Sequence, residues 1–366
     1  MRWWVTATLI VFVATSCSKK DSSGVATAAP YHKIDMHTHF PPRAAARMVG
    51  LMDRYGVATV VNLSGGSPGR GLEEQLAAAR TFPGRIKVFA NLDWRLATTG
   101  DGYGQKMAAN LARAAELGAV GLKIPKGLGI GFVDADRQLI AVDAPELDPV
   151  FEAAGRLGLP VSIHTGDPVA FWSPPTEDNE RYAELSVHPG WSFYGQPVPS
   201  WQDLFDAFER RVARHPNTTF IGVHFGNAPE FPDRVRAMLD KYPNLYIDTA
   251  ARVPEIGRRP AKQIKSLFAD HADRILFGTD LGVGTHPLDL MLGSTGATPP
   301  TKDDVDHFFA STWRYFETSD RDFAHPTPVQ GEWTISGIEL APELLKKLYG
   351  ANAARLLGLE PPKASP

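Results

Sequence analysis

Apolar and polar positions along this chain alternate between short extended runs and longer amphipathic segments. The short runs are rich in Val, Ile and Leu, which predicts buried strands over residues 34–37, 57–63, 86–91, 120–124, 161–164, 219–224, 245–249 and 275–280. Between them, apolar residues recur with helical spacing, which predicts helices over 43–55, 72–82, 106–117, 145–157, 201–214, 231–241, 260–269 and 343–357. Gly56, Gly118 and Gly158 stand where three of these helices end.

Strict alternation of eight strands with eight helices predicts an α/β fold, a (β/α)₈ (TIM) barrel. Two segments are too long for simple connections and predict insertions, residues 165–200 after the fifth strand and 281–342 after the eighth. An open, doubly wound sheet is the alternative architecture. It is disfavoured because no G-x-G-x-x-G sequence follows the first strand.

Residues with metal-binding or proton-transfer chemistry stand at the carboxyl ends of the predicted strands. Strand residues that are two positions apart point to the same face of the sheet. His37 and His39 therefore project to one side of the first strand. By the same alternation, Lys123 should point into the barrel rather than toward the helices. A barrel gathers strand ends around one axis, where barrel active sites form. The residues expected there are His37, His39, Lys123, His164, His224 and Asp280.

This set of residues resembles the amidohydrolase superfamily, in particular the amidohydrolase-related branch of metal-dependent hydrolases, lactonases and decarboxylases. The resemblance covers about residues 33–357 and rests on H-x-H on the first strand, His on the fifth and sixth, and Asp on the eighth. It implies that His37, His39, His164 and Asp280 hold a divalent metal, most commonly Zn²⁺. It also implies that His224 is either a further ligand or an acid/base group.

The chemical state of Lys123 determines whether the site would hold one metal ion or two. A carboxylated lysine at this position bridges two metals in binuclear members, whereas a free amine accompanies one metal in mononuclear members. Both possibilities stay open, and Lys126 stands close enough in sequence to compete for the role.

Two reactions are compatible with the predicted site. Metal-activated water would hydrolyse an amide, lactone or ester bond of a small molecule, with Asp280 moving the proton and His224 or the metal polarising the carbonyl. The same residues would support non-oxidative decarboxylation. A non-catalytic metal- or solute-binding protein is a third possibility, which an acid beside a histidine set disfavours.

Other polar residues allow weaker predictions. Arg252, just after the seventh strand, and His188, in the first insertion, are candidate contacts to substrate. Arg181 is expected in a solvated loop, Asp248 is expected to be structural, and Asp35 either orients a ligand or stabilises the barrel.

Composition and charge are those of an ordinary globular protein, long enough for one large α/β barrel or two smaller domains. The chain has 366 residues, of which 43% are hydrophobic and 22% charged, and a net charge of −3 that gives no reason to expect a nucleic-acid partner. The expected barrel domain runs over 33–358, with a short tail at 359–366. A small-molecule substrate is expected, and assembly into a homo-oligomer stays open.

The first residues have the layout of an export signal. A basic start is followed by an apolar run and small residues before Cys17, which is the sole cysteine. We therefore expect a signal peptide of the lipoprotein type over 1–17, a flexible linker over 18–32, and an exported protein held at a membrane through a lipid on Cys17.

Overall fold

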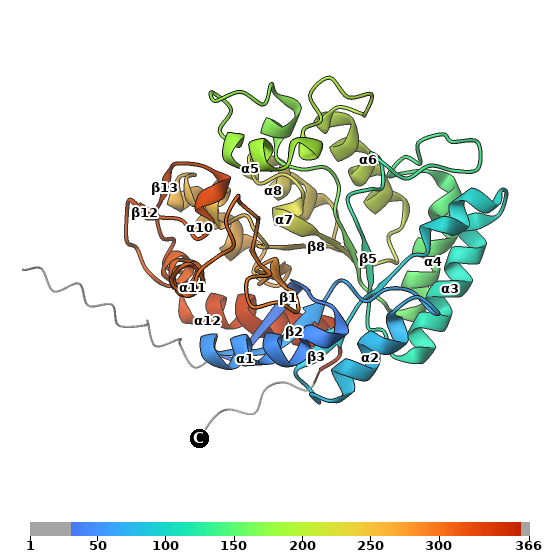
Figure 1. Cartoon of the computed structure of the whole chain (residues 1–366), viewed down its shortest axis with the longest axis horizontal. Helices are drawn as coiled ribbons and strands as arrows, with labels where there is room; N and C mark the ends of the chain where they lie inside the picture. The colour runs from blue at the N-terminus through green and yellow to red at the C-terminus, as the bar shows by residue number, and fades with distance from the viewer. Residues whose placement is uncertain (1–30, 360–366) are drawn as a thin grey trace, which may run out of the picture.

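The computed structural model describes residues 31–359, and the predicted leader, Cys17 and most of the predicted linker and tail lie outside them. Eight parallel strand segments lie at the centre of the molecule, with helices around them (Figure 1). The strands are β1 (Lys33–His39), β2 (Val57–Asn62), β3 (Ile86–Val88) with β4 (Ala90–Asn91), β5 (Leu122–Ile124), β6 (Val161–Ile163), β7 (Phe220–Gly222), β8 (Leu245–Asp248) and β9 (Ile275–Leu276).

Backbone hydrogen bonds join these strands into a closed barrel. β3 and β4 are one strand interrupted at Phe89, whose N–H donates to the Asn62 carbonyl at 3.0 Å. The first and last strands of the barrel are joined where β1 meets the segment after β9. There the Met36 N–H donates to the Phe277 carbonyl, and the Asp280 N–H donates to the His37 carbonyl, both at 2.9 Å. The predicted TIM barrel is therefore confirmed.

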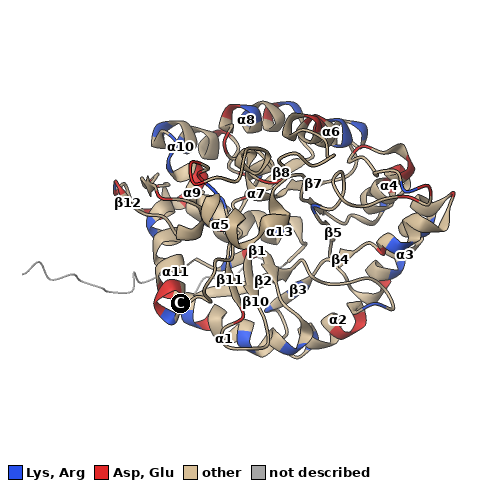
Figure 2. Ribbon diagram, turned by 45° about the horizontal axis from the view of Figure 1, so that its top comes forward, with Lys and Arg blue, Asp and Glu red and all other residues tan. Residues whose placement is uncertain are grey.

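Seven helices occupy the predicted positions around the barrel: α1 (Ala45–Tyr55), α2 (Leu72–Arg80), α3 (Tyr103–Leu117), α4 (Asp148–Leu157), α6 (Trp201–Arg214), α8 (Pro232–Lys241) and α10 (Ala261–Asp270). A Ser200–Asp203 capping box starts α6, because each side chain satisfies a backbone N–H of the other. Charged residues lie mainly on the outer helices and surface loops, whereas the central strands carry few (Figure 2). None of the helices within residues 31–359 is both long and apolar enough to cross a membrane.

The eighth helix position differs from the prediction. α11 (Lys302–Glu317), inside the second insertion, packs between α10 and α1 through the ring pairs Phe268–Phe316 and Tyr55–Phe309. The predicted helix over 343–357 is instead α12 (Pro342–Lys346), a π-helical turn (Lys347–Ala351) and α13 (Asn352–Leu356). Ala353 and Ala354 of α13 join the apolar cluster inside the barrel, so this segment covers one end of it.

The two insertions also contain short elements that cover the carboxyl ends of the strands. They are α5 (Tyr182–Val187) in the first insertion, and β10 (Leu281–Val283), β11 (Leu290–Leu292), β12 (Phe323–Ala324) and β13 (Thr334–Ile335) in the second. β10 pairs parallel to β1 and antiparallel to β11, so a hairpin extends the barrel wall beside His39. Two short helical turns, α7 (Val223–Gly226) and α9 (Val253–Gly257), follow β7 and β8.

Candidate active site

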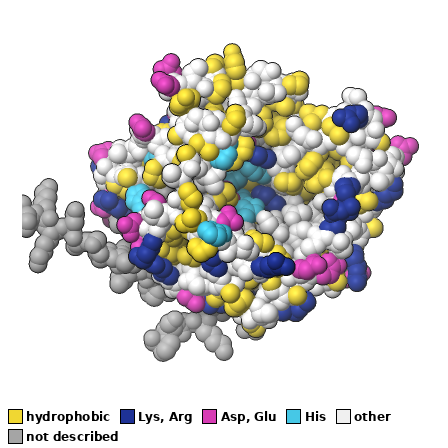
Figure 3. All heavy atoms as spheres, in the orientation of Figure 1, with side chains coloured by type: hydrophobic (Ala, Val, Ile, Leu, Met, Phe, Trp, Pro, Cys, Tyr) yellow, Lys and Arg dark blue, Asp and Glu magenta, His cyan; other side chains and the backbone are white. Residues whose placement is uncertain are grey.

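A cavity of about 250 Å³ opens at the carboxyl ends of the strands, and the predicted metal and catalytic residues line it. The face shown in Figure 3 is hollowed there, with histidine and basic side chains on its floor. His37, His39, Lys123, His164, His224 and Asp280 all contribute to this lining. The prediction that the strand ends converge on one site is therefore correct.

His37, His39 and Asp280 form the tightest group of possible metal ligands. The Nε2 atoms of His37 and His39 each lie 3.4 Å from Oδ1 of Asp280. One ligand atom from each residue lies within 4.8 Å of the others, a spacing that one cation could bridge. Two imidazoles and one carboxylate form a donor set suited to zinc and similar divalent ions. These three residues therefore fit the divalent metal that the sequence predicts.

Asp248, expected to be structural, orients His37 instead. Its Oδ2 lies 2.9 Å from Nδ1 of His37, and its Oδ1 accepts the N–H groups of His224 (2.8 Å) and Ala250 (3.1 Å). An ionised carboxylate can only accept, so Nδ1 of His37 carries the proton and Nε2 keeps its lone pair toward Asp280. A second possible group, His37–His224–Asp248, reflects this orienting contact.

His224 and His164 lie across the cavity from this group. Nδ1 of His224 lies 2.9 Å from the Ala250 carbonyl, which can only accept, so Nε2 of His224 is left as a base. The rings of His164 and His224 meet edge to face at 4.3 Å. His164 directs its Nε2 toward Asp167, 3.5 Å away, rather than into the His37–His39–Asp280 group.

Burial keeps His37, His164 and His224 neutral. Burial lowers the pKa of His37 and His224 well below the ordinary value, and burial lowers that of His164 to about 4. Burial alone would raise the pKa of Asp280, but its interactions with His37, His39 and Lys123 hold that pKa below its ordinary value. At neutral pH the cavity therefore presents His37, His164 and His224 as uncharged imidazoles and Asp280 as an ionised carboxylate, the forms that bind a metal.

Left-handed backbone conformations place two of the site residues. His224 has φ 55° and ψ 50° in the turn α7, so it lies just beyond β7 rather than in a strand as predicted. Asp280 has φ 61° between β9 and β10. Such conformations cost about 1–3 kcal/mol for residues other than glycine, and they concentrate at functional sites.

Lys123 points into the barrel, as the alternation of its strand predicts. It is 4% exposed, its Nζ has no hydrogen-bond partner among the described residues, and burial lowers its pKa to about 8. Lys126 lies further out, where its Nζ is 2.9 Å from Asp167 and 5.1 Å from the Trp191 ring centroid. Lys126 is therefore already paired, whereas Lys123 faces the cavity without such a partner.

The two predicted substrate contacts differ in position. Arg252 is buried, lines the cavity, and makes one hydrogen bond, to the Ala251 carbonyl. His188 stacks on Trp191 at 4.0 Å and hydrogen-bonds Thr295, so it lies behind Trp191 and is not part of the cavity lining. Only Arg252 of the two is placed to contact a ligand in this cavity.

Two other expectations from the sequence are settled by the contacts. Asp35 accepts the hydroxyl and N–H of Thr279 and the N–H of His37, so it ties β1 to the last strand, and burial raises its pKa to about 7. The expectation that Arg181 lies in a solvated loop is wrong. It is fully buried and pairs with Glu184 and Glu255, which fixes the first insertion over the cavity.

A family model described as amidohydrolase matches residues 34–359 of this chain. The chain belongs to the amidohydrolase family. Solved structures share its fold at low sequence identity. A 2,6-dihydroxybenzoate decarboxylase bound to 2,6-dihydroxybenzoate is 18% identical, with 90% of this chain and 100% of that one covered and a TM-score of 0.52.

A putative amidohydrolase from Staphylococcus aureus is 17% identical, with 90% and 100% covered and a TM-score of 0.53. An uncharacterised TIM-barrel protein from Bordetella bronchiseptica is 16% identical, with 89% and 98% covered and a TM-score of 0.52. No curated protein gives a significant match. At such identities the likeness establishes the barrel fold of this amidohydrolase, and not its reaction.

Asp167 also lines the cavity, and the sequence analysis does not single it out. It is buried between Lys126 and His164, and these neighbours hold its pKa below the ordinary value although burial alone would raise it. The only signal in the sequence is its position three residues after His164, in a segment predicted as loop.

Proposed function

We propose that this amidohydrolase is a metal-dependent hydrolase that cleaves an amide, lactone or ester bond of a small molecule. One observation carries the proposal: His37, His39 and Asp280 meet within ligand distance at the floor of a cavity that also holds proton-transfer groups. Bound to these three residues, a divalent ion such as Zn²⁺ supplies Lewis-acid polarisation and an acidified water. One or two ions fit the proposal, depending on whether Lys123 is carboxylated.

The residues of the chain itself divide the remaining work. Asp280 is ionised at neutral pH, so its carboxylate can take the proton of an attacking water and return it to the leaving group. Nε2 of His224, free of hydrogen bonds to the backbone, can donate to or accept from the carbonyl oxygen or leaving atom. Lys123 and Arg252 bring positive charge to the wall, where a substrate oxyanion or carboxylate would lie.

The first insertion closes the other side of the cavity. Phe171 and Trp191 line it, and Trp191 is held by the stacked ring of His188. Aromatic walls exclude water and strengthen the electrostatic interactions inside. His188 therefore supports substrate binding through Trp191 rather than by direct contact.

Decarboxylation is the second candidate, and a specific observation supports it. Lys123 and Arg252 face the cavity, and both could hold a carboxylate next to the metal ligands. A screen of the zinc-loaded protein against lactones, N-acyl compounds, esters and aromatic carboxylates, with carbon dioxide release recorded, separates the two reactions. Hydrolysis without carbon dioxide supports the proposal, and carbon dioxide release from an aromatic carboxylate overturns it in favour of the decarboxylase.

The proposal includes the place where this hydrolase acts. The export signal expected over 1–17 would deliver it to a membrane surface, tethered through Cys17. An exported enzyme meets substrates from outside the cytoplasm, which favours hydrolysis over the decarboxylation of internal catabolites. Localisation is therefore an independent test of the same proposal.

A further inference from the structure

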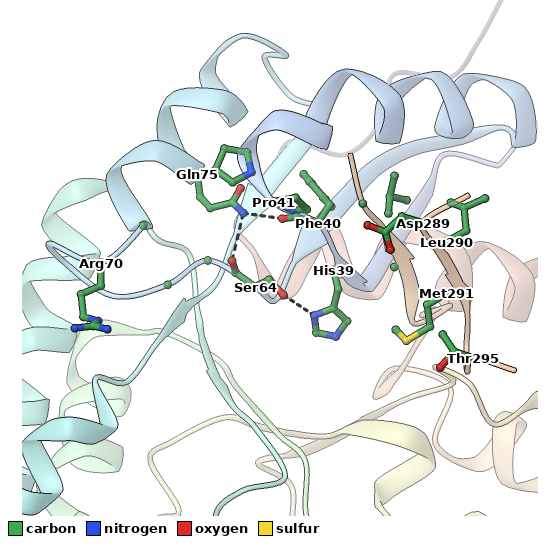
Figure 4. A pocket seen from close by; sticks show the side chains of 17 residues that line it. His39, Phe40, Pro41, Ser64, Arg70, Gln75, Asp289, Leu290, Met291 and Thr295 are labelled. Carbon is green, nitrogen blue, oxygen red and sulfur yellow. Dashed lines mark hydrogen bonds between the residues drawn. The ribbon is translucent and has the colours of Figure 1, made fainter. Parts of the chain in front are cut away.

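A second and larger hollow lies beside the metal-binding residues. It is a groove of about 600 Å³ between the loop at residues 64–71 and the β10–β11 hairpin, and we call it the outer groove. Figure 4 shows side chains from both of its walls, Ser64 and Arg70 on the loop side and Leu290 and Met291 on the hairpin side, with His39 between them. The cavity at the strand ends has less than half this volume.

The outer groove adjoins the metal-site cavity. His39 and Met291 line both spaces. The His39 ring directs Nε2 toward Asp280 in the cavity and Nδ1 toward Ser64 in the groove, where the hydroxyl lies 2.8 Å away. A substrate chain that passes His39 and Met291 would lead from the cavity into the groove.

The lining of the outer groove is mostly apolar. Phe40, Pro41, Val283, Leu290 and Met291 contribute to its walls. The charged side chains that take part, Arg70 and Asp289, are exposed. Water is therefore displaced favourably from the walls by an apolar group, while a polar end can remain in solvent.

The hairpin wall of the groove is held in place before any ligand arrives. Arg47 of α1 donates to the carbonyls of Gly284 (2.9 Å), His286 and Asp289 in the hairpin loop. Gly282 lies opposite Met291 in the strand pair, and a Cβ at Gly282 would lie 2.9 Å from that of Met291. The missing side chain lets Met291 lie close to β10, so the mouth of the groove stays open. A preformed wall loses little entropy when a ligand binds.

We infer that the outer groove binds an apolar tail of the substrate, an acyl, alkyl or aryl chain attached to the bond cleaved beside His39. This inference rests on the proposed function, because it adds a specificity to that reaction. The metal-site cavity alone would select small substrates. Together the two spaces select esters, lactones or amides with one long apolar substituent. Each methylene buried in the groove should raise affinity about two- to fourfold, which corresponds to about 0.4–0.8 kcal/mol.

Calorimetric titration of the zinc-loaded protein tests the inference without turnover. The probes are straight-chain carboxylates from acetate to decanoate, which carry the tail on the acyl side, and the matching alcohols, which carry it on the leaving-group side. We expect affinity in one of the two series to rise steadily with chain length. The responding series identifies the side of the bond that lies in the groove.

Variants of one residue make the test specific. Leu290→Arg places a charge in the groove and should reduce the ratio of long-chain to short-chain affinity in the responding series to near one. Leu290→Gln, which is neutral and of similar size, should reduce it less and covers the case in which the arginine variant fails to fold. Leu288→Arg is the matched control, because Leu288 is 56% exposed on the same hairpin and outside the groove lining.

Three outcomes overturn the inference: affinity independent of chain length in both series, no binding by any probe, or an unchanged ratio in folded Leu290 variants. Failure of the proposed reaction has a different signature. If acetyl esters are hydrolysed and affinity does not depend on chain length, the inference about the groove is wrong and the proposed hydrolysis stands. If affinity depends clearly on chain length but no substrate is hydrolysed, the proposed reaction is wrong and the inference that the groove binds an apolar tail stands.

Discussion

Asp248→Asn should weaken metal binding although Asp248 is not one of the three proposed ligands. Oδ1 of Asp248 accepts two backbone N–H groups, from His224 and Ala250, which fixes where the amide oxygen of Asn will lie. The new NH₂ group must then face Nδ1 of His37, where the carboxylate now accepts at 2.9 Å. An NH₂ group can only donate, so His37 must move its proton to Nε2.

The magnitude follows from the atom that is lost. Nε2 of His37 directs its lone pair toward Asp280, whose Oδ1 lies 3.4 Å away. A proton on Nε2 removes one of the three metal ligands unless metal binding returns that proton to Nδ1. Changing the residue that orients a metal-bound histidine typically costs 10–100-fold in metal affinity, or about 1.4–2.7 kcal/mol. The fold should survive, because the amide oxygen keeps both backbone hydrogen bonds.

The assay is competition for zinc with a chromophoric chelator at pH 7. Asp101→Asn is the matched control, because Asp101 is exposed and loses the same charge far from any site contact. Nitrogen NMR of the histidine rings gives a second readout, since it distinguishes a proton on Nδ1 from one on Nε2. Wild-type zinc affinity in folded Asp248→Asn would refute the orienting role and the tautomer assigned to His37.

Three further predictions test other parts of the account. Asp280→Asn should lower turnover by about 10²–10⁴-fold, because the amide cannot take a proton from water; near-normal rates in the folded variant would contradict the proposal. Lys123→Met should lower activity by about 10²-fold or more, and zinc content should fall by half only if the lysine bridges two ions; full activity would make Lys123 a barrel residue alone. Cys17→Ser should move the protein from the membrane to the soluble fraction in cell fractionation, and an unchanged distribution would count against the lipid anchor.

The barrel and the identity of its strand-end residues could be predicted from the sequence because both depend on local pattern. Alternation over two residues gives the shared face of His37 and His39, and the same rule gives the inward direction of Lys123. Helix ends at Gly56, Gly118 and Gly158 are correct because each glycine takes a positive φ there. These features need no knowledge of which segments meet in space.

The features that were missed depend on distant partners. Asp248 stands 211 residues from the histidine it orients, so no spacing in the chain reveals the contact. His224 takes a left-handed conformation although it is not a glycine, and its N–H donates to the carboxylate of Asp248, a contact that the sequence pattern does not reveal. α11 lies in the segment 281–342, which its length predicts as an insertion, although Phe309 and Phe316 pack this helix into the helix ring.

The most direct test of the central claim is the metal content of the purified protein and of two histidine variants. The account predicts tightly bound zinc in the wild-type protein and its loss in folded His37→Ala, because an apolar side chain removes a ligand that no neighbour replaces. His286→Ala should keep wild-type content, since His286 is exposed on the hairpin loop. Equal metal content in His37→Ala and wild type, or none in either, would contradict the metal site and the hydrolase built on it.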